Sequence, residues 1–297
     1  MLFHTLKRMC AFAWVADALL LSLFLVVAVQ QKLSVTAAQT PSNPGYNLQV
    51  YSKAAPRLPA TKDWTLQYEF RVPPLPSSSS WNYKVATVYQ WGDVDFDEYG
   101  SNGNYKLSDY RFNQIVPELL LGNVLDSNNS EYAPAWHQRD NWGIEAQYFW
   151  KNATTSTTYA QTGRIVKVSP GDQITATIHY EAKTGVIVAS IADSRLSGPG
   201  GVSTITIVRP FPNDPSLFTS WRDFFNKAVM SSKTPYVMST VAADVETYHL
   251  DQPTMCGLLP FTLRTISFPG VVSTPADFAA NSSNGFTCTH PLVKLDF

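Results

Sequence analysis

The chain has 297 residues, 44% of them hydrophobic, which suits one large folded domain or two small ones. Its formal net charge is −1 and its 22 Lys and Arg residues are scattered, so no basic block indicates a nucleic-acid partner. The sequence has no H-x-x-x-H pair, P-loop, G-x-G-x-x-G or G-x-S-x-G motif. It therefore gives no support to zinc, nucleotide, dinucleotide or serine-hydrolase chemistry, and we expect no cofactor.

Residues 1–38 predict a secretory signal. A basic start at His4–Arg8 precedes the apolar run Ala18–Val29, and small residues follow up to Ala38, near which we expect cleavage. The alternative is an uncleaved signal-anchor over Cys10–Val29, which is long enough to span a bilayer. Asp17 would then lie in hydrocarbon, which favours cleavage. We expect a secreted, extracellular protein that has no membrane contact unless the N-terminal segment is retained.

Cysteine usage and glycosylation motifs fit export. With Cys10 in the signal, Cys256 and Cys288 are left as a pair, and we predict a disulfide bond between them. Three N-x-[ST] sequons begin at Asn128, Asn152 and Asn281, and such sequons suit surface loops of a secreted glycoprotein.

The rest of the chain predicts an all-β fold. Gln39–Lys62 is rich in Pro, Ser and Ala and predicts a linker, and residues 63–297 then predict one β-sandwich domain. Alternating apolar and polar residues, separated by turn residues such as Pro170-Gly171-Asp172, predict many short strands. These strands are expected at Trp64–Val72, Tyr83–Trp91, Asn113–Leu121, Trp142–Trp150, Gly163–Val168, Gln173–Tyr180, Gly185–Ala192, Ser203–Arg209, Tyr236–His249, Leu263–Phe268 and Leu292–Phe297. The pattern is typical of a two-sheet antiparallel jelly-roll sandwich.

One segment, near residues 215–230, predicts an amphipathic helix. Asp214 would cap it and Pro215 would take the first helical position. Apolar residues recur at helical spacing from Leu217 to Val229. We expect this stripe to pack on the sandwich, with a membrane or partner surface as the alternative.

The stretch Asn141–Trp150 is the first candidate for chemistry. Read as a strand, it puts Trp142, Ile144, Ala146, Tyr148 and Trp150 on one face. Glu145, Gln147 and Phe149 fall on the other face. Glu145 and Gln147 could act as a general base and its hydrogen-bonding partner, or they could be ordinary polar residues on a solvent-facing sheet.

Two further groups have alternative interpretations. Asp93, Asp95 and Asp97 could point one way and hold Ca²⁺, although Glu98 stands where an EF-hand loop needs Gly, so a solvated acidic turn is the simpler prediction. Four aromatic residues are expected in or near loops or on the outer face, where rings stack against sugars: Trp81, Trp91, Trp136 and Phe149. Core packing is their alternative role.

Several stretches, in order, resemble the eqolisins, the secreted fungal glutamic peptidases, and their concanavalin-A-like relatives. The stretches are WTLQYEFRVP (64–73), IVPELLLG (115–122), NWGIEAQYFW (141–150), SPGDQITAT (169–177) and the VETYH and LLPFTLRTISF runs within 243–268. The resemblance implies a two-sheet jelly roll whose concave face takes an extended polymer, and a Gln–Glu pair that activates water at acid pH.

The resemblance places the catalytic Gln at Leu120, which cannot form the required hydrogen bonds. It places the catalytic Glu at Glu145 or, with a one-residue shift, at Ala146. Gln90, in a weaker copy of the Gln motif, is a possible replacement for the missing amide.

These features give three hypotheses. The first is a secreted, non-catalytic sandwich that binds an extracellular polymer such as a polysaccharide. The second is an acid-acting glutamic endopeptidase that uses Glu145 with Gln147 or Gln90. The third is a glycan-cleaving enzyme, which needs a second carboxylate near Glu145, from Glu118 or Glu246.

Overall fold

The structure is a computed structural model, and it describes residues 46–52, 59–77, 81–98, 112–126, 135–151, 158–196, 198–212, 218–230, 236–248, 261–264, 278–282 and 293–295. These residues form two β-sheets, as the alternating sequence predicts. Among them, no helix is both long and apolar enough to cross a membrane.

The larger sheet has eight strands in the order β13-β1-β11-β3-β4-β5-β6, with β7 also paired to β5. Every pair in this sheet is antiparallel. Its strands are β1 (Tyr46–Ser52), β3 (Thr87–Glu98), β4 (Phe112–Asp126), β5 (Ala135–Lys151), β6 (Thr158–Thr162), β7 (Val166–Lys167), β11 (Tyr236–Tyr248) and β13 (Phe278–Ser282).

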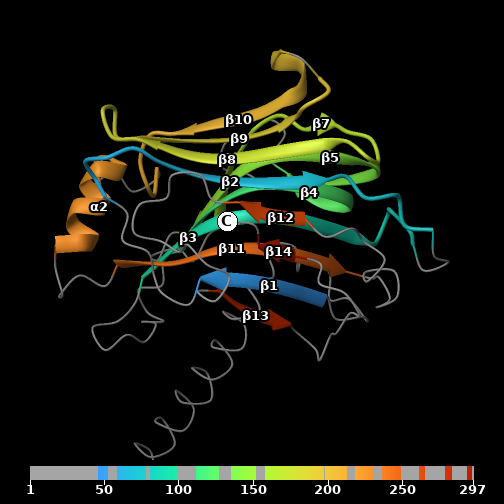
Figure 1. Cartoon of the computed structure of the whole chain (residues 1–297), viewed down its shortest axis with the longest axis horizontal. Coiled ribbons are helices and arrows are strands. Elements are labelled where there is room, and N and C mark those ends of the chain that lie inside the picture. The colour runs from blue at the N-terminus through green and yellow to red at the C-terminus, as the bar shows by residue number, and fades with distance from the viewer. Residues whose placement is uncertain are drawn as a thin grey trace, which may run out of the picture. The chain divides into compact units, whose positions relative to one another are not determined.

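The smaller sheet has six strands in the order β10-β9-β8-β2-β12-β14, which Figure 1 shows from β10 down to β14. Its strands are β2 (Trp64–Arg71), β8 (Gln173–Glu181), β9 (Val186–Asp193), β10 (Val202–Ile207), β12 (Phe261–Arg264) and β14 (Val293–Leu295). Only the last pair in this order, β12 with β14, is parallel. The predicted hairpin through Lys183-Thr184-Gly185 is confirmed, since β8 and β9 pair directly on either side of it.

The core lies between the two sheets. In β8 and β9 every second residue is buried, which is the pattern of strands with one face on a core. The inward residues of β5, including Trp142, Ile144 and Trp150, belong to the same buried cluster as Trp64 and Ile178 from the other sheet. The two alternating faces therefore fold as the sequence indicates.

One prediction about the N-terminal part is wrong. Tyr46–Ser52 falls in the predicted linker but forms β1, which pairs with β11 and β13. The segment YNLQVYS alternates apolar and polar residues over a short span, and the Pro- and Ser-rich sequence around it conceals that pattern.

The predicted helix is present as α2 (Trp221–Met230), and Asp214 and Pro215 lie outside the described residues. Its N-terminal cap is Ser220: the Asp223 backbone N–H donates to Ser220 Oγ at 3.1 Å, and the Thr219 N–H donates to Asp223 Oδ2 at 3.2 Å. This reciprocal arrangement is close to a capping box, so the sequence prediction missed Ser-x-x-Asp as the start signal.

Helix α2 packs on the core, as expected. Trp221, Phe224 and Phe225 are buried, and the Trp221 Nε1–H donates to the Ile207 carbonyl at 3.0 Å. The Trp221 ring also contacts Tyr148 edge-on, with ring centroids 6.1 Å apart. Burial raises the pKa of the Tyr148 phenol, and the hydrogen bond that its oxygen accepts from the Phe211 N–H opposes this only in part.

The pairing of β3 with β4 is interrupted in the middle of the sheet. Register partners run from Thr87 to Trp91 and resume at Val94, so Gly92 and Asp93 have no partner across the gap. The β4 residue at this level is Pro117, which has no N–H to donate to a ladder. The next residue along β4 is Glu118.

Candidate functional site

Strand pairing brings two glutamates together on the larger sheet. Glu118 on β4 is the direct register partner of Glu145 on β5. Their strand neighbours Leu119, Ile144 and Ala146 belong to the core between the sheets, so both glutamates lie on the opposite face. Partners across an antiparallel pair have Cβ atoms about 5 Å apart, which brings the two carboxyl groups close to each other.

Gln147 links the two carboxyl groups. Its Nε2 donates to Glu145 Oε2 at 3.1 Å and to Glu118 Oε1 in a very short contact. Because one nitrogen reaches both groups, these two carboxyl oxygens are separated by no more than two hydrogen-bond lengths, about 6 Å. We call Glu118, Glu145 and Gln147 the carboxyl cluster.

The carboxyl cluster is shielded from water, contrary to the expectation of a solvent-facing sheet. The exposed fractions are 4% for Glu118, 0% for Glu145 and 1% for Gln147. Alternation predicts which face a polar residue takes, but it does not predict whether that face is covered. Polar residues held at this level of burial need partners inside the protein, and the cluster supplies some of them internally.

A hydroxyl from the other sheet holds β5 at this point. The Ala146 N–H donates to Ser203 Oγ of β10 at 3.0 Å, and Ser203 is fully buried. On the same side the Ala146 carbonyl accepts from the Gly163 N–H at 2.8 Å. The residue between Glu145 and Gln147 is thus fixed through both backbone groups. The sequence prediction missed Ser203, since a lone buried Ser in a strand gives no signal.

Aromatic rings lie beside the carboxyl cluster. Trp91 on β3 is the register partner of Glu118, and its ring meets Tyr89 edge-on with centroids 6.2 Å apart. Phe149 lies on β5 two residues after Gln147. Both rings lie on the outer face, as expected, but they are shielded there, since Trp91 is 7% and Phe149 9% exposed. Trp81 is partly buried against the core, and the side chain of Trp136 lies outside the described residues.

The structure shows on which face of the larger sheet each candidate from the eqolisin resemblance lies. Glu145 lies on the face of the carboxyl cluster, whereas Ala146 packs in the core. Leu120 is fully buried and pairs with Gly143. Gln90 is the register partner of Leu119, a core residue, so it lies on the core side and is not brought together with Glu145.

The acidic group predicted as a turn or a Ca²⁺ loop is part of a strand. Asp93, Asp95 and Asp97 alternate with Val94 and Phe96 inside β3, and Val94 is fully buried. That period-2 pattern of Val and Phe favours a strand over the turn. Among the described side chains no group of three or more His, Cys, Asp or Glu could hold a metal ion, and the side chains of these three aspartates are outside that set.

Several other predicted positions lie outside the described residues: Cys256, Cys288, Asn128 and Asn152. Asn281 lies in β13 opposite Gln49, so this sequon is in a strand and not in the loop that we expected. The backbone of Glu246, the other candidate for a second carboxylate, lies on β11 opposite Tyr89, next to β3.

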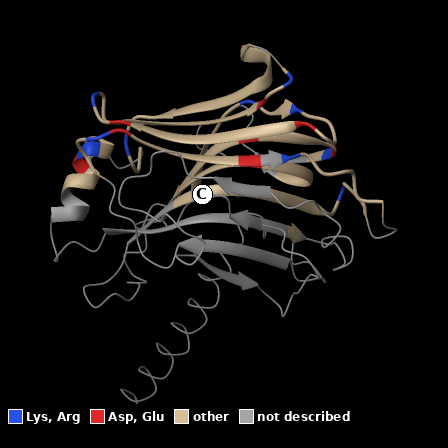
Figure 2. Cartoon of the chain, viewed as in Figure 1, with Lys and Arg blue, Asp and Glu red and all other residues tan. Residues whose placement is uncertain are grey.

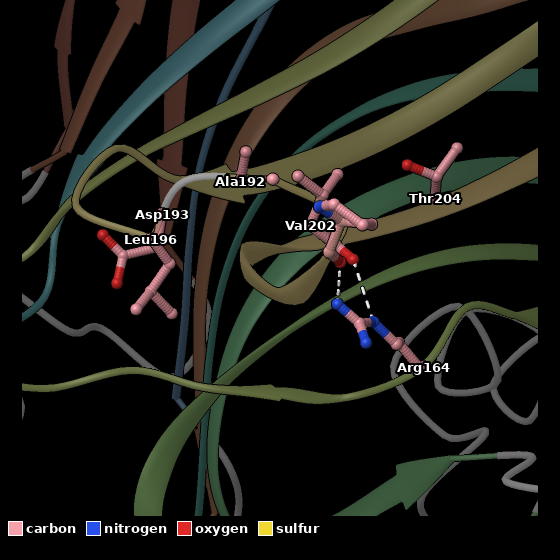
Figure 3. A pocket seen from close by; sticks show the side chains of 8 residues that line it. Arg164, Ala192, Asp193, Leu196, Val202 and Thr204 are labelled. Atoms are coloured by element: carbon pink, nitrogen blue, oxygen red, sulfur yellow. Dashed lines mark hydrogen bonds between the residues drawn. The ribbon is translucent and has the colours of Figure 1, made fainter.

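A hollow of about 680 Å³ lies beside β10, away from the carboxyl cluster, and is drawn in Figure 3. Arg164 lines it, and its Nε donates to the Val202 carbonyl at 3.1 Å while a terminal nitrogen contacts the Pro199 carbonyl. Gln161 similarly donates to the Thr206 carbonyl at 3.2 Å. These side chains satisfy carbonyls along an edge strand, which is a structural role.

No protein-family model and no curated protein matches the chain. Among solved structures, Scytalido-glutamic peptidase with a peptide-based transition-state analog is similar over 70% of this chain and 65% of its own, at 10% identity and a TM-score of 0.28. Basic winged bean lectin with Tn-antigen is similar over 69% of this chain and 72% of its own, at 12% identity and a TM-score of 0.22. At these scores neither similarity bears on what this chain does.

Proposed function

We propose that the protein is a carboxyl-dependent hydrolase that cleaves an extracellular glycan. The observation that carries the proposal is the pairing of Glu118 with Glu145 around a single amide nitrogen. Two carboxyl groups about 5–5.5 Å apart are the arrangement with which retaining glycosidases cleave a glycosidic bond. The separation that Gln147 permits includes this range.

Burial suggests a division of roles. We assign the nucleophile to Glu118, which accepts a hydrogen bond from Gln147 and is 4% exposed, and the proton donor to the fully buried Glu145, because burial favours the neutral form of a carboxyl group. The protonated Glu145 gives its proton to the leaving oxygen as the Glu118 carboxylate attacks the anomeric carbon. Glu145 then takes a proton from water, the water oxygen attacks the same carbon, and the ester to Glu118 breaks.

A sugar has to reach side chains that are nearly fully shielded, so productive binding requires this face of the sheet to open. Gln147 Nε2 lies between the two carboxyl groups, where the scissile bond would lie. We infer that the Gln147 side chain rotates away when substrate binds, and that its amide then holds a neighbouring hydroxyl group.

Peptide cleavage is the second candidate, because the Glu145–Gln147 hydrogen bond at 3.1 Å places an amide beside a carboxyl group. Pure binding is less well supported, since the rings expected to form an open binding row are buried where they are described. In the experiment that follows, cleavage of casein alone indicates the peptidase, and no cleavage of either substrate indicates pure binding.

The test compares the purified wild-type protein with Glu118→Gln and Glu145→Gln on a panel of soluble glycans and on denatured casein, from pH 3 to 8. Glu69→Gln on the smaller sheet is the control. We expect release of reducing ends by the wild type and the control, and a loss of about a hundred-fold or more in each cluster variant. Glycan cleavage that is unchanged in both variants would refute the proposal, and cleavage of casein alone would favour the peptidase.

A further inference from the structure

The two sheets differ sharply in charge. The six-stranded sheet is balanced, with three acidic residues (Glu69, Glu181, Asp193) and three basic ones (Arg71, Arg264, Lys294) in its strands. Figure 2 shows both signs along β2 and around α2. The strands of the eight-stranded sheet contain three basic residues, Arg139, Lys151 and Lys167, and ten acidic ones: Asp93, Asp95, Asp97, Glu98, Glu118, Asp126, Asp140, Glu145, Asp244 and Glu246. The formal charge of the whole chain is only −1, so negative charge is concentrated in this sheet.

The register places several of these acids at neighbouring positions around the carboxyl cluster. Asp244 on β11, Trp91 on β3, Glu118 on β4 and Glu145 on β5 form one continuous row of partners across four strands. Glu246 is in the adjacent row, opposite Tyr89. Acidic residues therefore occupy register positions from the cluster across β3 to β11.

A second observation points to the type of ligand group. Gln147 Oε1 is buried and accepts no hydrogen bond among the described residues. A buried acceptor without a donor is costly, and a ligand that brings N–H or O–H groups removes that cost. Carboxylates are also acceptors when ionised. The group that complements both features is a positively charged hydrogen-bond donor, such as an ammonium group.

We propose that the substrate is a glycan whose sugars carry free amino groups. This inference rests on the proposed glycan hydrolysis and adds the charge of the substrate. The acidic sheet attracts the polymer through its ammonium groups, and the unpaired oxygen of Gln147 accepts from one of them or from an adjacent hydroxyl. The rings of Tyr89 and Trp91 are buried next to the cluster, so they can meet the C–H side of a sugar only when this face of the sheet opens.

The experiment compares two polymers with the same backbone, one with free amines and one fully N-acetylated and therefore neutral, at about 20 mM and about 500 mM salt. We expect the wild type to have a KM roughly ten-fold lower for the amine polymer at low salt, and to lose that preference at high salt. The double variant Asp244→Asn/Glu246→Gln should lose most of the preference. Glu69→Gln/Glu181→Gln, which removes the same charge from the other sheet, should keep it.

The outcomes separate this inference from the proposed function. Equal KM values for both polymers, or a preference that high salt leaves unchanged, would overturn the inference while glycan hydrolysis stands. Binding of the amine polymer with no cleavage of any glycan would refute the hydrolase and retain the charge recognition. Cleavage of a lysine-rich peptide in place of either glycan would overturn the inference as well.

Discussion

Replacing Ser203 with Ala tests how firmly the site strand is held. Ser203 is fully buried, and its Oγ accepts a hydrogen bond from the Ala146 N–H at 3.0 Å. In Ser203→Ala the Ala146 N–H loses this acceptor, which lowers the free energy of unfolding by about 1–3 kcal/mol. For a domain of this size each kcal/mol lowers Tm by about 2–4 °C, so we expect a fall of roughly 4–8 °C for a central cost of about 2 kcal/mol.

The assay is urea and thermal unfolding of Ser203→Ala beside a matched control, Ser190→Ala. Ser190 lies on the partly exposed outer face of β9, and its replacement should change the unfolding free energy by less than about 0.5 kcal/mol. Because Ala146 lies between Glu145 and Gln147, Ser203→Ala should also slow glycan cleavage, whereas the control should not. If Ser203→Ala is as stable as the control, the bond between the sheets does not hold β5 and our reasoning about the site strand fails.

Three further predictions concern the fold. Gly122→Ala should destabilise the protein by about 2 kcal/mol or more in urea unfolding, because Gly122 has φ of 93° and a Cβ there would overlap the Ala86 carbonyl; wild-type stability would contradict this. Trp221→Ala should cost about 3–5 kcal/mol through loss of a fully buried side chain at the start of α2, measured in the same way. Burial raises the pKa of Tyr148 above its ordinary 10.0, so at alkaline pH the phenol loses its proton when the protein unfolds. The contribution of Tyr148 to the free energy of unfolding is therefore complete below pH 10 and declines above it by about 1.4 kcal/mol per pH unit. Tyr148→Phe should therefore flatten the decline in stability between pH 10 and 11, and an unchanged slope would disprove that cause.

Much of the fold follows from the sequence because period-2 alternation is a local property. The stretch from Trp64 to Arg71 and the hairpin of β8 and β9 have one polar and one apolar face, and both form the expected strands. The aspartates of β3 misled the prediction because their charge suggests a turn, whereas Val94 and Phe96 between them decide the structure.

The carboxyl cluster could be predicted only in part. Alternation places Glu145 and Gln147 on one face, and Glu118 was one of two candidates for the second acid. The choice between Glu118 and Glu246 depends on strand order, since β4 and not β11 is the neighbour of β5. Strand order is a long-range property that no local pattern contains. The cover over this face and the bond from Ser203 are long-range as well.

Three departures from ordinary sheet construction occur at one place, which favours a functional site over a purely structural role for these residues. Pro117 interrupts the β3–β4 ladder in a central strand, where proline is normally excluded. The next residue, Glu118, is a buried acid that directly faces a second buried acid, Glu145. Gln147 between them keeps one buried oxygen without a donor among the described residues. Any one of these features costs stability, and an apolar residue at positions 118 and 145 would avoid most of that cost. Proteins keep such local conflicts mainly where a site needs them.

We therefore expect Glu118→Leu/Glu145→Leu to be at least as stable as the wild type in urea unfolding and to be inactive. A large loss of stability would instead identify the cluster as part of the structural framework.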